Sequence, residues 1–266
     1  MSSEAPSLAG AEGSAQQPRL RWLREVWDSS LGKKIFVATT GVILAAYVIL
    51  HALGNLKALQ GPNSGGEASI DEYAHFLRTV GGPAIPEEGV LWIIRLILIA
   101  ALAIHVVGVM QLVKRNRAAR PSKRPPVIER SLASRTMALS GVLLLAFIVF
   151  HILQFTTLTI HPTPLAEGEI YANVYGAFQE WWIVAIYLIA VAFLFLHLRH
   201  ALWSLLQTLG WDKPNRNPTF RRGATATAAL VCIAFASVPI LCFSGVLPEP
   251  DDGPTAAQVA TTGAAP

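Results

Sequence analysis

The sequence predicts an all-α membrane protein in which five transmembrane helices form a bundle. Apolar residues make up 53% of the 266 positions and charged residues only 14%, and the mean hydropathy is +0.45. Five apolar runs reach the length of about 20 residues that a helix needs to cross a bilayer. Lysine and arginine are concentrated in alternate connections between these runs. The isoelectric point of about 9.3 therefore reflects membrane topology, and lipid rather than nucleic acid is the expected partner.

The chain is predicted to form one membrane domain, residues 19–247, between two disordered tails. Residues 1–18 are rich in Ala, Ser, Gly and Gln, and residues 248–266 in Pro, Ala and Gly, without helical periodicity. Apolar residues recur at helical spacing in residues 20–27, which predicts a short amphipathic helix at the membrane surface.

The order of the spans and the charge of their connections predict the orientation of the chain. The connections before the first span, after the second and after the fourth are basic, and the others are mostly acidic, so the N-terminus is expected in the cytoplasm and the C-terminus outside. A short surface helix is predicted over Ile70–Val80, and the other connections are expected to be polar loops. The predicted spans are Lys34–Leu53, Val90–Val113, Thr136–Leu158, Trp181–Leu206 and Ala224–Leu247.

Two of the spans share a repeat that ends in a histidine. Residues 41–51 read Gly-Val-Ile-Leu-Ala-Ala-Tyr-Val-Ile-Leu-His, and residues 141–151 read Gly-Val-Leu-Leu-Leu-Ala-Phe-Ile-Val-Phe-His. An ionisable side chain costs a few kcal/mol or more within a bilayer, so its presence there indicates function. His51 and His151 are therefore candidate site residues.

Depth sorts the histidines of the spans into two pairs. At about 1.5 Å per residue, His51 lies about 25 Å and His151 about 22 Å from the inner ends of their spans, near the outer face. His105 and His197 lie about 22 Å and 24 Å from the outer ends of theirs, near the inner face. Each pair comes from two different helices, so each can bring two imidazoles face to face.

Two imidazoles that face each other in an apolar slot are the axial ligands of a b-type haem. The pattern therefore predicts two haems, one between His51 and His151 and one between His105 and His197. Zinc usually takes three or four ligands, and the two cysteines are too few for an iron–sulfur cluster. The sequence has no Cys-x-x-Cys-His motif, so covalent attachment of that type is not expected. The simpler alternative is that each histidine only hydrogen-bonds a neighbouring helix.

Two other polar residues in the spans have roles that the pattern leaves open. His200 lies three residues after His197 on nearly the same helix face. His197 is favoured as the ligand because it lies deeper, and His200 is the alternative. Arg95 lies just below the outer end of its span, where it would bind a haem propionate or a polar ligand, or else extend to the lipid headgroups.

Five motifs resemble the cytochrome b membrane subunit of succinate:quinone oxidoreductases and fumarate reductases, in its single-subunit, five-span, two-haem form. Together they extend over about residues 29–213, and the fifth span agrees by position alone. The motifs are Ser30-Leu-Gly-Lys-Lys34, His51-Ala-Leu-Gly-Asn-Leu56, Tyr73-Ala-His-Phe-Leu77, Phe150-His-Ile-Leu-Gln-Phe155, and Leu196-His-Leu-Arg-His200 with Trp203-Ser-Leu-Leu-Gln-Thr-Leu-Gly-Trp211.

The resemblance implies a function and a set of partners. In this family the first and third spans ligate the outer, distal haem, and the second and fourth ligate the inner, proximal haem. The chain would then be the electron-transferring anchor of a succinate dehydrogenase (quinone) complex in the bacterial cytoplasmic membrane, without a role in succinate oxidation itself. The implied partners are a flavoprotein and an iron–sulfur subunit on the cytoplasmic side, and the implied substrate is menaquinone or another quinone.

The quinone site has weaker signals, because no Asp or Glu lies within a span. Its candidates are Asp71, Tyr73, His75 and Arg95, from the first outer connection and the outer end of the second span. For Tyr73 and His75, packing of the connection over the bundle is the alternative. Two alternatives to the whole assignment are a cytochrome b anchor of another quinone-linked dehydrogenase and a haem-free transporter with a histidine relay.

Overall fold

The structure, a computed structural model, describes residues 21, 25–61, 67–119, 132–160, 168–211 and 217–250. The predicted N-terminal tail, most of the predicted C-terminal tail and His161 lie outside the described residues. Part of the predicted surface helix at residues 20–27 is described, and residues 25–28 are helical.

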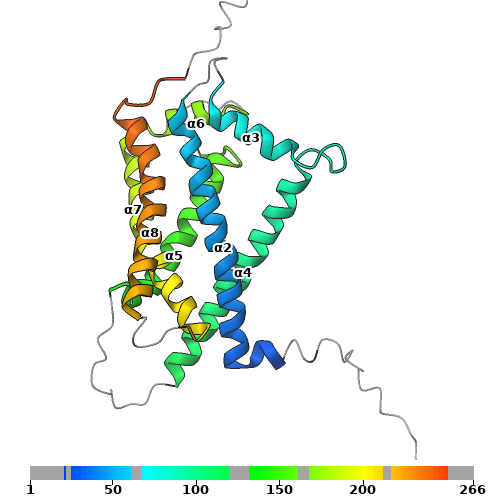
Figure 1. Cartoon of the computed structure of the whole chain (residues 1–266), viewed down its shortest axis with the longest axis vertical. Helices are drawn as coiled ribbons and strands as arrows, with labels where there is room; N and C mark the ends of the chain where they lie inside the picture. The colour runs from blue at the N-terminus through cyan, green and yellow to red at the C-terminus, as the bar shows by residue number, and fades with distance from the viewer. Residues whose placement is uncertain are drawn as a thin grey trace, which may run out of the picture.

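Five helices that are long and apolar enough to cross a membrane confirm the predicted architecture (Figure 1). Each contains most of its predicted span, and several continue past it because the backbone gains hydrogen bonds by staying helical through the polar ends. Ser29 caps the first helix, and its side chain accepts the Gly32 N–H at 2.8 Å. The helices are α2 (Ser30–Asn55), α4 (Gly89–Ala118), α5 (Leu132–Phe155), α7 (Trp181–Thr208) and α8 (Asn217–Phe243).

Three short helices lie together at one end of the bundle (Figure 1). The predicted surface helix is present as α3 (Ser69–Thr79), and η1 (Leu56–Gln60) extends the first span. The connection between the third and fourth spans was expected to be a polar loop, and this prediction is wrong for α6 (Ile170–Ala177). With only eight residues, α6 is too short to show helical periodicity in the sequence.

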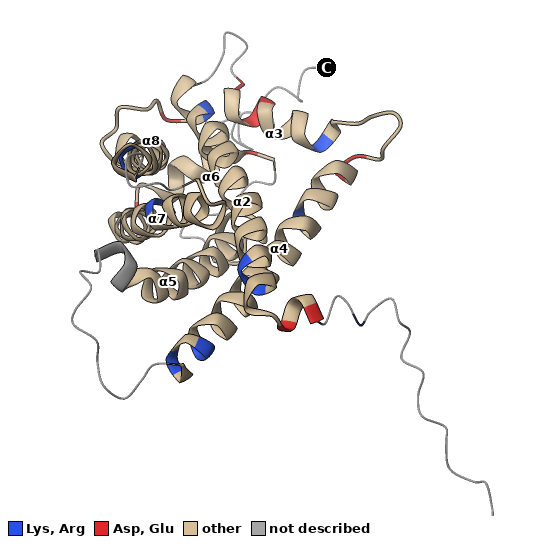
Figure 2. Ribbon diagram, turned by 60° about the horizontal axis from the view of Figure 1, so that its bottom comes forward, with Lys and Arg blue, Asp and Glu red and all other residues tan. Residues whose placement is uncertain are grey.

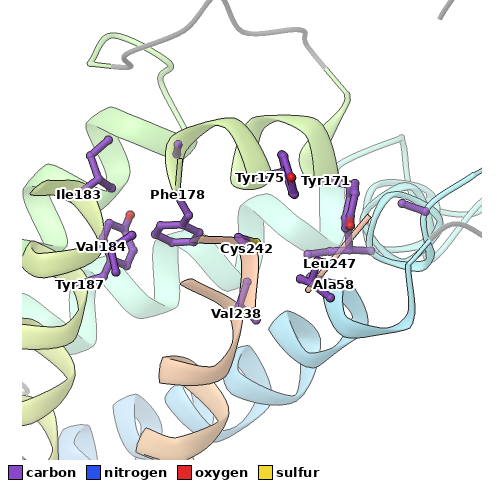
Figure 3. Close-up of a cluster of buried hydrophobic side chains, with 13 residues drawn as sticks. Ala58, Tyr171, Tyr175, Phe178, Ile183, Val184, Tyr187, Val238, Cys242 and Leu247 are labelled. Atoms are coloured by element: carbon purple, nitrogen blue, oxygen red, sulfur yellow. The ribbon is translucent and has the colours of Figure 1, made fainter. Parts of the chain in front are cut away.

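Side chains of α6 belong to the larger of two buried clusters (Figure 3). Tyr171 and Tyr175 lie beside Cys242 and Leu247, and Phe178 packs against Tyr187. The Tyr171 hydroxyl donates to the Pro248 carbonyl at 2.7 Å, and burial raises the pKa of Tyr171 to about 12. The phenol therefore stays protonated and keeps α6 attached to the end of α8.

The long helices pack in a defined order. Helix α7 packs against both α5 and α8, and α2 packs against α4, with further contacts from α2 to α7 and α8. The smaller buried cluster joins Ala52, Leu198, Ala228 and Val231 of α2, α7 and α8. This order brings α2 and α5, which carry the repeated sequence, to two sides of the same interior.

The outer surfaces of the long helices are apolar, as contact with lipid requires. Leu96, Val142 and Leu230 are each more than 60% exposed. Lys, Arg, Asp and Glu are confined mainly to the helix ends and connections (Figure 2). The protein is therefore a multi-pass membrane protein.

Candidate functional site

The predicted outer pair, His51 of α2 and His151 of α5, meets inside the bundle. The ring centres are 5.8 Å apart and the ring planes are inclined by 77°. An imidazole nitrogen binds a transition metal at about 2 Å, so two imidazoles on opposite sides of one metal ion have ring centres about 6 Å apart. The spacing of the pair therefore fits bis-histidine ligation of a haem iron.

A buried network holds the His151 ring. The His151 Nδ1 lies 3.0 Å from the Tyr187 hydroxyl of α7, which donates to Gln154 Oε1 at 2.8 Å. A phenol has a single proton, and Tyr187 gives it to Gln154, so the Nδ1 of His151 must donate to the phenol oxygen. The other nitrogen, Nε2, then carries the lone pair that a metal needs.

The partner ring, His51, is held by packing. The Tyr47 ring is stacked on it at 5.4 Å with an angle of 12°, and Phe235 of α8 lies 5.7 Å away. Within the described part of the chain, the His51 ring makes no hydrogen bond. The two histidines of the outer pair are therefore oriented by different means.

The predicted inner pair begins with His105 of α4, whose Nδ1 faces α2. It lies 3.2 Å from the Val37 carbonyl and 3.3 Å from the Thr40 hydroxyl. The carbonyl can only accept, so Nδ1 of His105 donates and Nε2 is left with the lone pair. The Thr40 hydroxyl gives its own proton to the Phe36 carbonyl at 2.7 Å, which leaves it an acceptor for the same imidazole.

The second member of the inner pair, His197 of α7, has the same kind of partner on α5. Its Nδ1 lies 3.3 Å from the Ser140 hydroxyl, which donates to the Met137 carbonyl at 3.0 Å. Ser140 is fully buried. The hydroxyl is thus an acceptor for Nδ1–H, and Nε2 is again free. His105 and His200 are both neighbours of His197 within electrostatic range.

The glycines that open the two repeats lie against the inner pair. A Cβ on Gly41 would lie 3.4 Å from Cε1 of His105, and one on Gly141 would lie 3.6 Å from Cε1 of His197. The next nearest ring atom is Nδ1 in both cases, so a side chain longer than a methyl would press on the Cε1–Nδ1 edge of the imidazole. The repeat therefore contributes to both pairs: its small residues adjoin the inner histidines, and its own histidine belongs to the outer pair.

His200, the alternative to His197, has different neighbours. Its ring packs edge-on to Trp203 at 6.3 Å, and the Trp203 ring also carries the Arg221 guanidinium at 4.8 Å from its centre. These contacts lie towards the end of α7, and they favour His197 as the member of the inner pair.

The histidines form pairs rather than larger clusters. Among the described residues, no group of three or more His, Cys, Asp or Glu side chains could hold a metal ion. Both cysteines are buried and unpaired. A site that needs three protein ligands, such as that of catalytic zinc, therefore has no counterpart in the described part of the chain.

The quinone candidates Tyr73 and Arg95 lie near Tyr47, which the sequence did not single out. Both are close enough to Tyr47 for electrostatic interaction. Tyr73 Cε1 lies 3.0 Å from the position that a Cβ on Gly54 would occupy, so the absence of a side chain there lets α3 approach α2. Since Tyr47 also stacks on His51, these aromatic rings connect the outer histidine pair to the short helix α3.

Arg95 has a partner that neither sequence alternative named. Its Nη1 lies 3.7 Å from Glu88 Oε2, and its guanidinium lies 4.9 Å from the centre of the Trp92 ring. Both residues precede it on the chain, so Arg95 points back towards the outer end of α4.

The other two quinone candidates, Asp71 and His75, have different surroundings from Tyr73 and Arg95. The Asp71 carboxylate accepts the first backbone N–H groups of α6, from Ile170 at 2.6 Å and Tyr171 at 3.0 Å. It thereby caps a helix that the sequence did not predict. His75 is exposed on α3.

One family has a sequence profile that matches the chain. It is described as the succinate dehydrogenase/fumarate reductase transmembrane subunit, and the match covers residues 115–238. The matched segment, just under half of the chain, is therefore similar to that family. The matched segment contains His151 and His197, one histidine from each pair, together with Ser140, Gln154 and Tyr187. No curated protein and no solved structure matched the chain.

The match supports the resemblance to the anchor subunit of succinate dehydrogenase and fumarate reductase. A succinate dehydrogenase/fumarate reductase transmembrane subunit associates with the other subunits of its complex in the membrane. The match by itself does not identify a cofactor of this chain.

Proposed function

We propose that the chain is the membrane anchor and electron-transfer subunit of a succinate:quinone oxidoreductase, with two non-covalent haem b groups. The observation that carries the proposal is the pairing of four histidines from four helices. In three of them, Nδ1 is hydrogen-bonded to an acceptor. The ring centre of the fourth, His51, lies 5.8 Å from that of His151, a spacing that fits two ligands of one metal ion. A histidine that only joined helices would not need to be held in the tautomer that leaves its other nitrogen free.

The inner pair, His105 and His197, faces the side of the partners. Basic residues at the end of α4 and the start of α8 support a cytoplasmic location for this side. A flavoprotein that oxidises succinate and an iron–sulfur subunit would dock there, in the cytoplasmic membrane of a bacterium. Thr40 and Ser140 keep the two imidazoles in the tautomer that offers Nε2.

The chemistry is a transfer of two electrons from succinate to quinone. Succinate loses two electrons and two protons to become fumarate, and the quinone gains two electrons and two protons to become quinol. Haem bound by the two histidine pairs would supply one-electron carriers between the iron–sulfur partner and the quinone. The chain's own residues hold the ligands and exclude water, since the interior around His151 is aromatic.

The quinone, for which menaquinone is the first candidate, would bind at the outer end of the bundle. Tyr47 supports this location because it stacks on His51 and lies near Tyr73 and Arg95. Tyr73 and Tyr47 offer hydroxyl donors and Arg95 a positive charge to the carbonyl oxygens of a quinone. Asp71 and His75 are weaker candidates, because Asp71 caps α6 and His75 is exposed.

The proposal is tested by purifying the complex from membranes, identifying its subunits and recording its spectrum. We expect a flavoprotein and an iron–sulfur subunit in the complex, and a b-type spectrum that succinate reduces. Reduction by hydrogen or formate but not by succinate would assign the chain to another dehydrogenase. Absence of Soret absorption would contradict the proposal. It would favour a haem-free anchor if the dehydrogenase subunits are present, and the histidine-relay transporter if they are absent.

A further inference from the structure

The Tyr187–Gln154 network beside His151 is more elaborate than ligand orientation requires. Tyr187 is 8% exposed and Gln154 only 1% exposed, although both carry polar groups within an apolar span. Burying such groups costs free energy unless each has a partner. Tyr187 has both of them as its hydrogen-bond partners: His151 on one side and Gln154 on the other.

The direction of the network is fixed by its protons. His151 Nδ1–H donates to the Tyr187 oxygen, and Tyr187 O–H donates to Gln154 Oε1. Donation by Tyr187 makes its oxygen a better acceptor, because consecutive hydrogen bonds polarise one another. A stronger acceptor at Nδ1 increases the electron density of the imidazole, and so the basicity of its Nε2.

The phenol is held rigidly enough to act in this way. The Tyr187 ring meets Phe147 edge-on at 4.9 Å and an angle of 86°, and Phe178 at 4.9 Å and 84°. Figure 3 shows Tyr187 beside Phe178, Val184 and Val238 in the buried cluster. Two perpendicular aromatic neighbours fix the ring plane and hence the position of its oxygen.

The network acts on only one of the two outer ligands. His51 makes ring contacts with Tyr47 and Phe235 but no hydrogen bond within the described ranges. Any electronic effect of hydrogen bonding on the outer site therefore enters through His151.

We propose that Tyr187 and Gln154 are positioning residues that lower the reduction potential of the distal haem by strengthening His151 as a ligand. The inference rests on the proposed function. A more basic axial imidazole stabilises the ferric state more than the ferrous state, so its loss should raise the potential. The network would thereby set how readily the outer site gives electrons to the quinone.

The test is a potentiometric titration of the purified complex, with the distal component identified as the one that His151→Ala removes. We expect Tyr187→Phe, which removes only the hydroxyl, to shift the distal midpoint to a more positive value and leave the proximal midpoint unchanged. Gln154→Leu, which keeps the phenol but removes its acceptor, should shift it in the same direction by less. Phe150→Leu is the control, because Phe150 is a more distant aromatic neighbour of Tyr187, at 6.4 Å, and neither fixes its ring plane nor takes part in a hydrogen bond of the network. It should leave the midpoint close to that of the unaltered complex.

The possible outcomes distinguish a failure of this inference from a failure of the proposed function. Two haems and an unshifted distal midpoint in Tyr187→Phe would overturn the inference alone, as would an equal shift in Phe150→Leu. If Tyr187→Phe does not assemble, Gln154→Leu decides by the same criterion. An unaltered complex with one haem or none would overturn the inference together with the two-haem proposal.

Discussion

The inner and outer histidine pairs occupy opposite ends of one bundle but are oriented in different ways. At the inner end, small hydroxyl residues one position before the repeat glycines accept Nδ1–H from the histidines of the next helices. At the outer end, the repeat supplies the histidines themselves, and among the described residues only His151 has a hydrogen-bonded support, built from Tyr187 and Gln154. The inner support is local to a short sequence pattern, whereas the outer one depends on tertiary packing.

This difference gives the repeat a meaning that the sequence alone does not reveal. Ten residues separate Gly41 from His51 and Gly141 from His151. At about 1.5 Å per residue, this spacing is about 15 Å along a helix, the distance between two sites at different depths. Each copy therefore contributes a support to one histidine pair and a histidine to the other.

The largest effect is expected from removing a ligand. His197→Ala should abolish the proximal haem and halve the haem content, because no other described histidine has the same support from Ser140. His200→Ala is the matched control and should retain both haems, since His200 packs on Trp203 instead. The pyridine haemochrome assay on purified complex measures both. Loss of haem in His200→Ala with retention in His197→Ala would show that His200, and not His197, is the ligand.

The next effect concerns the glycines of the inner site. Gly41→Leu should lower occupancy of the proximal haem, because the side chain would press on the Cε1–Nδ1 edge of the His105 ring and displace it. Gly41→Ala should be tolerated, since its methyl would lie 3.4 Å from Cε1, an ordinary contact distance. Haem per chain and the proximal component of the spectrum are the measurements. Full occupancy in Gly41→Leu would show that the glycine has no role at the site.

A smaller effect is expected from removing the hydroxyl groups. Ser140→Ala should raise the midpoint potential of the proximal haem, because the hydroxyl is the acceptor that the structure gives to His197 Nδ1. Thr40→Val should raise it less, because His105 Nδ1 keeps the Val37 carbonyl. Redox titration of the two variants against the unaltered complex gives the order. Equal shifts, or a larger one in Thr40→Val, would contradict the described hydrogen bonds.

The smallest effect is expected from the carboxylate that joins α3 to α6. Asp71→Ala should destabilise the outer end by about 1–2 kcal/mol, since two N–H groups at the start of a helix lose a charged acceptor. Asp71→Asn retains an acceptor oxygen and should recover part of this loss in a thermal unfolding measurement. If Asp71→Asn is stable but no longer reduces quinone, Asp71 has a role at the quinone site as well.

Much of the fold could be predicted because lipid imposes a strong constraint on sequence. Apolar length predicted the five spans, and the rise of a helix predicted which histidines share a depth. The helix α6 could not be predicted, because it is short and its stability comes from Asp71 and the buried Tyr171. Polar side chains such as Gln154 and Tyr187 are individually unremarkable in sequence, and only the packing of α5 on α7 makes them partners of His151. The pairing of Arg95 with Glu88 likewise depends on the turn that precedes α4.

The central claim is that two histidine pairs hold two haems in one chain. The most direct measurement is the ratio of haem b to this chain in the purified complex, determined by pyridine haemochrome and quantitative protein analysis. The account predicts a ratio of two, falling to one when either His151 or His197 is replaced by alanine. A ratio of one or zero in the unaltered complex would contradict it.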